Sequence, residues 1–253
     1  MARQDSIIKF KGQMGGISFY KSAQDGHLAR QKGGVDAKRI QTDPAFARTR
    51  ENGSEFGRAG SNGKLLRTAF RSQLLNTGDS RMANRLSALL NAVLKTDQVS
   101  LRGQRNVANG DLNLLRGFDF NDEGKLTHTF FAPYAADVDR VTGTVTIDVP
   151  AFVPTDMIAY PDGATHFRLV AAAAEVDFAE NAYNVQALET DELVLGALPA
   201  APVNLALTMS PGNTDPLFVV LGIEFAQLVN GQMYTLNNGA YNALSLVAIE
   251  PGA

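Results

Sequence analysis

The sequence predicts an α+β protein: an N-terminal β-hairpin and an extended basic arm, then a helical hairpin, then an antiparallel β-sandwich. Three patterns predict this order. Apolar residues alternate with polar ones near the N-terminus, recur at three- and four-residue steps between residues 61 and 96, and form many short segments after residue 126. With 253 residues, the chain is long enough for one large domain or two modest ones. We place the boundary after residue 116, so that a basic region, 1–116, precedes an acidic domain, 117–253.

The first predicted element is a group of short antiparallel strands in residues 6–32. Ile8–Lys11 and Ile17–Tyr20 alternate apolar with polar residues, the period of a half-exposed sheet. The glycines at positions 12, 15 and 16 mark the first turn, and Asp25-Gly26 is a strong signal for the second. Three such strands bury little surface by themselves, so we expect them to pack on another surface.

Residues 33–60 are predicted to form an extended basic arm, because glycines and basic residues punctuate them throughout. Asp43-Pro44 is a good helix start, since Asp can cap a helix and Pro suits its first position. A short helix from Pro44 to about Phe56 therefore fits, although Gly53 weakens it.

Residues 61–96 predict two helices. Ser61 can cap a helix that runs to about Leu75, and Asp79 can cap a second one with apolar residues at three- and four-residue steps. The short connection Asn76–Gly78 favours an antiparallel helical hairpin.

The chain from residue 126 onward predicts a β-sandwich, because short apolar segments alternate with turn-forming clusters such as Pro161–Gly163 and Asn237–Gly239. The predicted strands are 126–132, 140–149, 166–178, 183–188, 193–195, 203–209, 217–228, 233–236 and 243–249. An antiparallel sheet can carry acidic residues on a solvated face.

The net charge of −3 conceals a strong division of charge along the chain. Up to Arg116 there are 20 basic and 9 acidic residues, a net charge of +11. From Gly117 onward there are 3 basic and 17 acidic residues, a net charge of −14. Such a division is typical of nucleic-acid binding or of charge complementarity between copies of one chain, although two soluble domains of different surface composition would also show it.

No motif of the sequence predicts an enzyme, a metal site or a cofactor. The absence of Cys excludes a thiolate nucleophile and a Cys-ligated metal, and the three His have no second ligand at helical or hairpin spacing. Gly60–Leu65 lacks the first Gly and the hydroxyl residue of a phosphate loop, and Gly12–Gly16 lacks the spacing of a dinucleotide fingerprint. The acidic segment Asp119–Gly124 does not meet the spacing of a calcium loop, so a turn or solvated face is the simpler interpretation.

No segment predicts membrane insertion or secretion. The N-terminus lacks an apolar run of signal-peptide length, and apolar windows such as Leu217–Ile223 fall far short of the roughly 18 residues needed to span a bilayer. We therefore expect synthesis as a soluble cytoplasmic protein. The final location stays open, and an extracellular particle or filament would require release by lysis or by a route without such a signal.

Several segments together resemble a family of uncharacterised bacterial proteins. The opening Ile-Ile-Lys-Phe-Lys-Gly and Gly-Gly-Ile-Ser-Phe-Tyr carry the resemblance, and so do Thr42–Phe46, Thr49–Gly53, Glu55–Gly57, Gly63–Arg67, Gly103–Asn106, Leu221–Phe225 and Asn230–Tyr234. The order of a small sheet followed by basic helices is also similar to that of some phage-like structural proteins. The resemblance implies a structural role and assigns no site residues.

The function predicted from these features is that of a non-enzymatic subunit that assembles with copies of itself into a filament, tube or virion-like shell. The predicted contact joins the basic arm of one copy to the acidic β-domain of the next. The residues assigned to it as assembly or anion-binding groups are Arg30, Lys32, Lys38, Arg39, Arg48, Arg50 and Arg58. The alternative is nonspecific nucleic-acid binding by the same residues. A ligand-binding β-sandwich and a hydrolase with a dispersed site rank below both.

Overall fold

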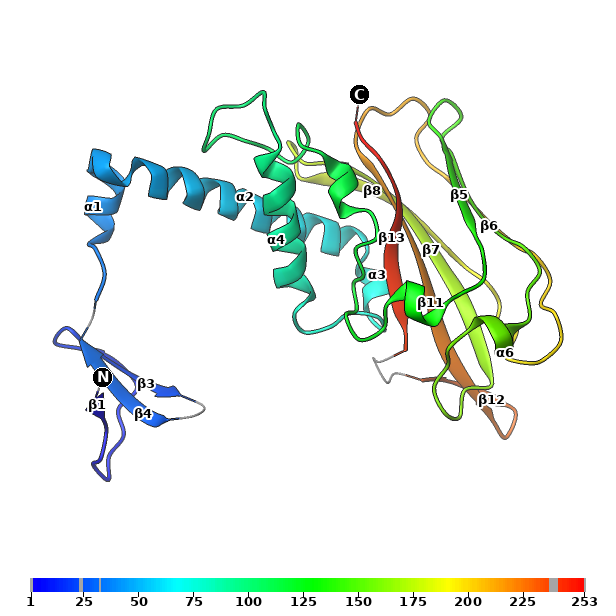
Figure 1. Ribbon diagram of the computed structural model, residues 1–253, viewed down its shortest axis with the longest axis horizontal. Helices are drawn as coiled ribbons and strands as arrows, with labels where there is room; N and C mark the ends of the chain where they lie inside the picture. The colour runs from blue at the N-terminus through cyan, green and yellow to red at the C-terminus, as the bar shows by residue number, and fades with distance from the viewer. Residues whose placement is uncertain (1, 23–24, 32, 237–240, 253) are drawn as a thin grey trace. The chain divides into compact units, whose positions relative to one another are not determined.

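The computed structural model describes residues 2–22, 25–31, 33–236 and 241–252, and it contains both helices and antiparallel sheets (Figure 1). The α+β class is thus confirmed. The chain forms two compact units, Met1–Arg50 and Glu51–Ala253, called here the N-terminal and C-terminal units. Their boundary falls within helix α2 (Ala47–Ala69) and does not coincide with the sequence-based boundary after residue 116.

The N-terminal unit contains a four-stranded antiparallel sheet in the order β1-β4-β3-β2. Its strands are β1 (Ala2–Arg3), β2 (Gly12–Met14), β3 (Ile17–Ser22) and β4 (Gly26–Gln31). The predicted first turn is present between β2 and β3, where Gly15 and Gly16 have φ angles of 55° and 79° that favour glycine.

The strand predicted from the alternation over Ile8–Lys11 is wrong, because this segment folds back on Gln4. The side-chain amide of Gln4 donates to the carbonyl of Phe10 (3.2 Å) and accepts from its N–H (2.7 Å). These bonds satisfy the backbone groups of Phe10 that a neighbouring strand would otherwise bind.

The extended arm predicted over residues 33–60 is also wrong, since most of it is helical. Helix α1 (Ala37–Thr42) is capped by Asp36, and the 3₁₀ helix η1 (Pro44–Phe46) is capped by Asp43 with Pro44 in its first turn. Helix α2 then runs from Ala47 to Ala69. The predicted start at Asp43-Pro44 is correct, and the predicted end near Phe56 is too early.

The C-terminal unit contains the rest of α2 together with α3 (Arg71–Leu74) and α4 (Met82–Lys95), which form the predicted helical hairpin. Ser61 lies inside α2 and does not cap a helix. The glycines do not break α2, which is continuous from Ala47 to Ala69. One of them, Gly63, allows α4 to approach closely, and this packing stabilises the helix. A Cβ atom at Gly63 would lie 3.3 Å from both Leu90 Cδ1 and Ser87 Oγ.

Two antiparallel sheets make up most of the C-terminal unit. The small sheet has the order β10-β6-β5, and the large sheet is built on β12-β11-β7-β8, with β13 paired to β11 and β9 paired to β7. The strands are β5 (Ala135–Asp139), β6 (Thr144–Val149), β7 (His166–Asp177), β8 (Ala182–Glu189), β9 (Leu193–Val194), β10 (Val203–Thr208), β11 (Leu217–Val229), β12 (Gln232–Leu236) and β13 (Ala243–Glu250).

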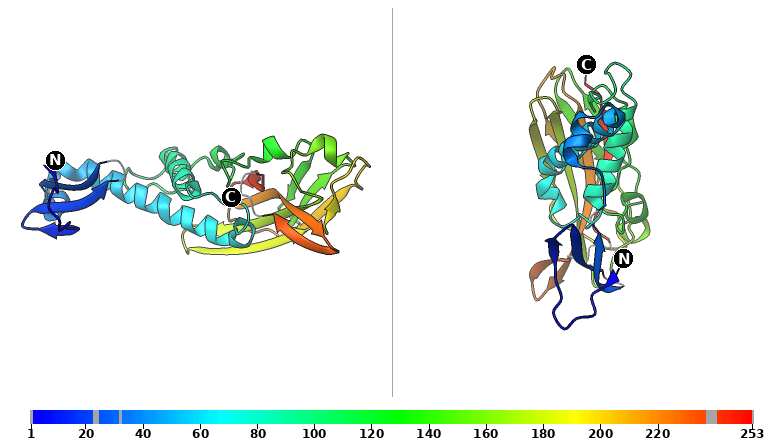
Figure 2. Two further views of the ribbon diagram at one scale, coloured as in Figure 1. Left: turned by 90° about the horizontal axis from the view of Figure 1, so that it is seen from below. Right: turned by 90° about the vertical axis from the view of Figure 1, so that its left-hand side faces the viewer.

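The central strands β7 and β11 are buried on both faces, which explains their continuous apolar sequences. One face shares a buried cluster with α2 and α4, and the other shares a second cluster with the small sheet. On β7, for example, the helix side receives Val170, Ala172 and Ala174, and the other side receives Leu169, Ala171 and Ala173. Figures 1 and 2 show the helices over one side of the large sheet.

Two further differences from the predicted strands concern the residues before β6. The predicted strand 126–132 is wrong, because Leu126–Thr129 forms the short helix α5, whose first N–H donates to Asp119 Oδ1 (3.1 Å). The predicted strand 140–149 begins only at Thr144, and β5 precedes it. The remaining short elements are η2 (Leu112–Leu115) and α6 (Pro154–Met157). The predicted turn at Asn237–Gly239 lies outside the described residues.

Candidate functional site

The N-terminal sheet presents an apolar face, called here the apolar platform, formed by Phe10, Met14, Ile17, Phe19 and Ala29. Residues directly opposite each other in an antiparallel sheet share a face. Ile17 pairs with Met14, and Phe19 pairs with Ala29, while the Phe10 ring lies 5.6 Å from the Phe19 ring. A hollow of about 660 Å³ lies along this face, lined in part by Ile17 and Ala29.

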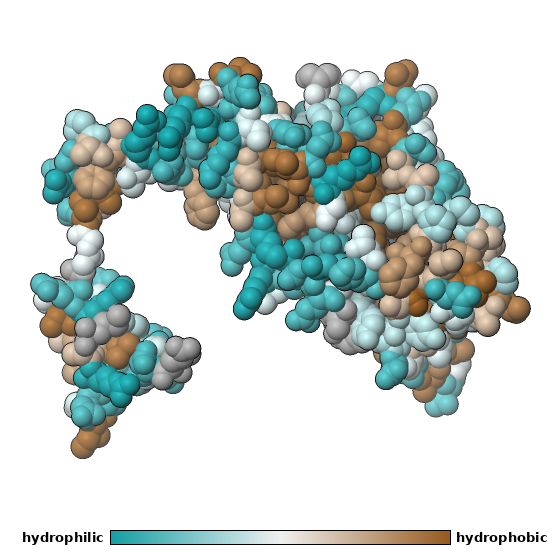
Figure 3. All heavy atoms as spheres, in the orientation of Figure 1, coloured by the Kyte–Doolittle hydropathy of each residue, from teal (hydrophilic) through white to brown (hydrophobic). Residues whose placement is uncertain are grey.

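The apolar platform is poorly covered. Leu28 is the one buried hydrophobic residue among the described residues of the N-terminal unit, and Phe10, Met14 and Ile17 are 49%, 63% and 42% exposed. Ile7, in the adjoining loop, is fully exposed. Figure 3, in which apolar residues are brown, shows apolar and polar surface interspersed over this unit. Such a surface is typical of an element that is covered by a partner.

The structure distributes the predicted basic residues over several elements. Arg30 lies on β4 with its guanidinium carbon 5.3 Å from the centre of the Tyr20 ring. Lys38 lies on α1, and Arg48 lies on the first turn of α2; both are exposed. Lys32 lies outside the described residues.

Arg39 and Arg50 meet at Asp43. Arg39 Nε lies 3.1 Å from Asp43 Oδ2, while Arg50 Nη1 donates to the carbonyls of Asp43 (2.9 Å) and Ile40 (2.7 Å). The N–H of Ala45, the Arg39 guanidinium and the charge of Arg50 together hold the pKa of Asp43 below its ordinary value. Arg50 therefore fastens α1 to α2, a structural task that competes with anion binding.

Arg58 belongs to the C-terminal unit, where its guanidinium donates to the carbonyls of Arg105 and Gly103. Together with Glu55, which accepts from the N–H of Gly103 (2.7 Å), it fastens the loop after α4 to α2. The seven predicted residues are therefore not one continuous patch, and Arg58 serves the fold.

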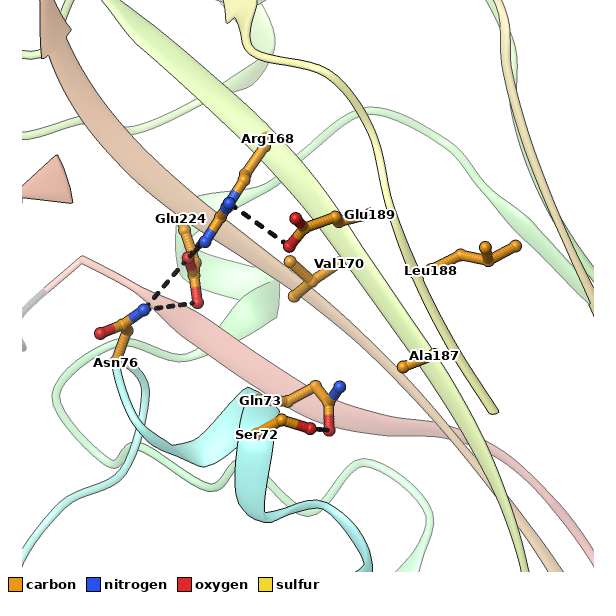
Figure 4. Close-up of a pocket in the computed structure, with 9 residues that line it drawn as sticks. All are labelled: Ser72, Gln73, Asn76, Arg168, Val170, Ala187, Leu188, Glu189 and Glu224. Atoms are coloured by element: carbon orange, nitrogen blue, oxygen red, sulfur yellow. Dashed lines mark hydrogen bonds and ion pairs between the residues drawn. The ribbon is translucent and has the colours of Figure 1, made fainter. Parts of the chain in front are cut away.

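A second candidate site, called here the Arg168 pocket, lies on the C-terminal unit and has a volume of about 300 Å³. It is lined by Ser72, Gln73, Asn76, Arg168, Val170, Ala187, Leu188, Glu189 and Glu224 (Figure 4). Arg168 on β7 lies directly opposite Glu224 on β11 in the sheet register. Figure 4 shows the Arg168 guanidinium between the carboxylates of Glu224 and Glu189.

The buried carboxylate of Glu224 anchors this pocket. Its Oε2 atom accepts from Arg168 Nη2 (2.6 Å) and Nε (3.0 Å), and both of its oxygens lie within 3.4 Å of Asn76 Nδ2. Arg168 Nη1 lies 3.3 Å from Glu189 Oε2. These bonds tie the loop after α3 to the large sheet.

Negative charge exceeds positive charge around Arg168. Burial alone would lower the pKa of Arg168, but Glu224, Glu189 and Glu192 raise it, so one guanidinium faces three carboxylates. The Glu192 Oε2 atom is buried without a hydrogen-bond partner among the described residues. The exposed Asp191 adds a further negative charge. This edge of the large sheet therefore suits a cationic partner.

The Arg168 pocket is not among the sites predicted from the sequence. The available signal is a pair of opposite charges, each inside an otherwise apolar strand: Arg168 within residues 167–174 and Glu224 within residues 217–226. A charge in a strand that is buried on both faces needs a partner of opposite sign.

The described ranges contain no group of three or more His, Cys, Asp or Glu side chains that could hold a metal ion. Within the same part of the chain, no helix is both long and apolar enough to cross a membrane. Comparison with protein-family models, with curated proteins and with solved structures finds no match.

Proposed function

We propose that this protein is a non-enzymatic structural subunit that assembles with copies of itself through its N-terminal unit. The observation that carries the proposal is the poorly covered apolar platform. A unit of about 50 residues is marginal by size alone, and units near or below this size commonly need a disulfide, a metal or a partner. The chain has no Cys, and the described residues offer no metal cluster, so a partner surface remains.

Charge favours a second copy as that partner. The N-terminal unit carries 10 basic and 4 acidic residues, and the C-terminal unit carries 13 basic and 22 acidic residues. Net charges of +6 and −9 attract each other between copies, an attraction that salt weakens. A contact between two different surfaces is heterologous, so it closes into a ring or extends into a filament, tube or shell.

The two sheets of the C-terminal unit, which share one buried cluster, support the proposal of a β-sandwich as the rigid body of the subunit. The second candidate function is nonspecific nucleic-acid binding, which the exposed Lys38 and Arg48 on successive helices favour.

Sedimentation velocity and negative-stain electron microscopy of nuclease-treated protein test the proposal at about 50 mM and about 500 mM NaCl. We expect ordered assemblies at low salt and monomers at high salt. Protein that stays monomeric at low salt and high concentration overturns it, and a steep salt-dependent affinity for DNA in that protein establishes the second candidate.

A variant of the apolar platform makes the same test at one residue. Ile17→Glu places a charge in the centre of the platform, and we expect it to weaken self-association about tenfold or more. The matched control is Val141→Glu, at an 83% exposed residue of the C-terminal unit, which leaves association unchanged. Equal association of both variants would show that the apolar platform is not the contact.

A further inference from the structure

We infer that the apolar platform of one copy docks on the Arg168 pocket and the neighbouring β8–β9 strip (Ala187–Val194) of a second copy. This inference rests on the proposed function and names its acceptor surface. The acceptor surface has an excess of carboxylates and exposed apolar side chains, and the opposite surface has two exposed lysines with no ion pair among the described residues.

Several other acidic groups of the C-terminal unit are engaged in local structure. Asp139 accepts from the N–H groups of Val141 and Thr142, and Asp148 accepts from the side-chain amide of Asn204. Asp177 accepts from the two N–H groups of its own turn, and Asp122 forms an ion pair with Lys125. These carboxylates have less to gain from a cationic partner than those of the strip.

The β8–β9 strip differs because the carboxylates that act on Arg168 outnumber this one cation. Glu189, Asp191 and Glu192 fall within four residues, and Arg168 is already bound by the buried Glu224. The buried Glu192 Oε2 atom still lacks a donor among the described residues. A basic group from a second copy would reduce the excess negative charge of the strip.

The strip also offers apolar surface to match the apolar platform. Val194, which pairs with His166 and so shares the face of Arg168, is 66% exposed, and Val170 and Ala187 line the adjoining pocket. The outer face of the small sheet provides no such match, because its exposed residues are small or polar: Ala135, Asp137, Asp139, Asp148, Asn204, Ala206 and Thr208.

Two lysines border the apolar platform and can reach the carboxylates of the strip. Lys21 follows Phe19 on the same face of β3, and Lys11 immediately precedes β2. Both are exposed, and neither has an ion-pair partner among the described residues. Their pairing with the strip would leave Ile17 and Met14 opposite Val194.

Charge reversal with complementation tests the acceptor surface. The donor variant is Lys11→Glu with Lys21→Glu, and the acceptor variant is Glu189→Gln with Asp191→Lys. Each variant alone should associate about tenfold or more weakly than wild type. An equimolar mixture should associate again, because the intact lysines of the acceptor variant can dock on the intact carboxylates of the donor variant.

The control is Asp137→Lys with Asp148→Lys on the small sheet, which should assemble as wild type. A wild-type protein that stays monomeric overturns the proposed function itself. A wild type that assembles, with an acceptor variant that assembles equally well, overturns only the acceptor surface. Dichroism spectra of all variants verify that the C-terminal unit is folded.

Cross-linking tests directly whether residue 21 of one copy lies close to residue 191 of another, without relying on variants that weaken assembly. Because the chain has no Cys, Lys21→Cys and Asp191→Cys each introduce a single thiol. A short bismaleimide should join the two variants into a heterodimer when they are mixed at low salt. The mixture of Lys21→Cys with Asp137→Cys is the control, and equal cross-linking of both mixtures would overturn the inference.

Discussion

Asp97 is a buried carboxylate that organises the loop after α4. It is 2% exposed, and its oxygens accept from the N–H groups of Val99 (2.8 Å), Ser100 (3.0 Å) and Asn106 (3.0 Å). Burial alone would raise the pKa of Asp97, but these donors outweigh burial and hold the pKa well below its ordinary value of 3.8. The ionised form is therefore the one that stabilises the loop.

Asp97→Asn should lower the free energy of unfolding at pH 7 by about 1–3 kcal/mol, because the amide replaces a charged acceptor. The folded-state pKa is depressed, so the stability that Asp97 contributes is present above pH 3.8 and is lost as the pH falls below it. Urea unfolding between pH 7 and about pH 3 measures this effect. The difference between wild type and variant should shrink at the acidic end, and a constant difference would contradict the assignment.

The ion pair between Arg168 and Glu224 gives a second prediction, which concerns the free energy of unfolding. Glu224 is 3% exposed, so Arg168→Ala leaves a buried carboxylate without its cation and should cost about 3–5 kcal/mol. Arg168→Met combined with Glu224→Met removes both charges and should cost less than the single change. Urea unfolding of the three proteins gives the comparison, and a double variant at least as unstable as Arg168→Ala would contradict it.

Strand β11 contains a glycine with no room for a side chain, whereas helix α2 contains a glycine beside open space. The two positions give a prediction about the stability of these elements. A Cβ atom at Gly222 would lie 2.5 Å from the Ala243 carbonyl oxygen and 2.9 Å from Val170 Cγ2, whereas one at Gly57 meets nothing within 4 Å. Gly222→Ala should destabilise by about 1–3 kcal/mol through overpacking. Gly57→Ala should stabilise by about 0.5–1 kcal/mol, because Ala is the better helix former. Thermal unfolding should therefore shift in opposite directions.

The elements that the sequence predicts well are those with the strongest apolar patterns. Helix α4 and strands β7 and β11 have long apolar faces or runs, and their predicted ranges agree closely with the structure. The prediction of an extended arm over residues 33–60 is wrong because tertiary contacts outweigh the low helix propensity of the glycines. Glu55, Ala59 and Gly63 face the core of the C-terminal unit, and that packing outweighs the glycines.

The candidate site could be predicted only in part. Charge and composition identify a basic N-terminal part and an acidic C-terminal part, but the apolar platform depends on which residues of β2, β3 and β4 lie opposite each other. The alternating segment Ile8–Lys11 folds onto Gln4 and forms no strand, so its alternation does not reveal the register. Arg50 and Arg58 look like free cations in sequence, yet Arg50 binds the carbonyls of Ile40 and Asp43, and Arg58 binds carbonyls of the loop after α4.

At the scale of the whole molecule, the two units should differ in stability when the chain is monomeric. The C-terminal unit has two buried clusters, whereas Leu28 is the one buried hydrophobic residue among those described in the N-terminal unit. Because few buried contacts mean a low free energy of local opening, amides of β3 and β4 should exchange rapidly in the monomer, while those of β7 and β11 stay protected.

Hydrogen exchange at high salt and low concentration, compared with low salt and high concentration, measures this difference directly. Assembly should slow exchange in β3 and β4 about tenfold or more, because the partner then covers the apolar platform and adds its binding free energy to local stability. Ile17→Glu should abolish the slowing without altering β11. If β3 and β4 were as protected as β11 in the dilute monomer, the N-terminal unit would be stable alone, and its exposed apolar residues would no longer imply a partner.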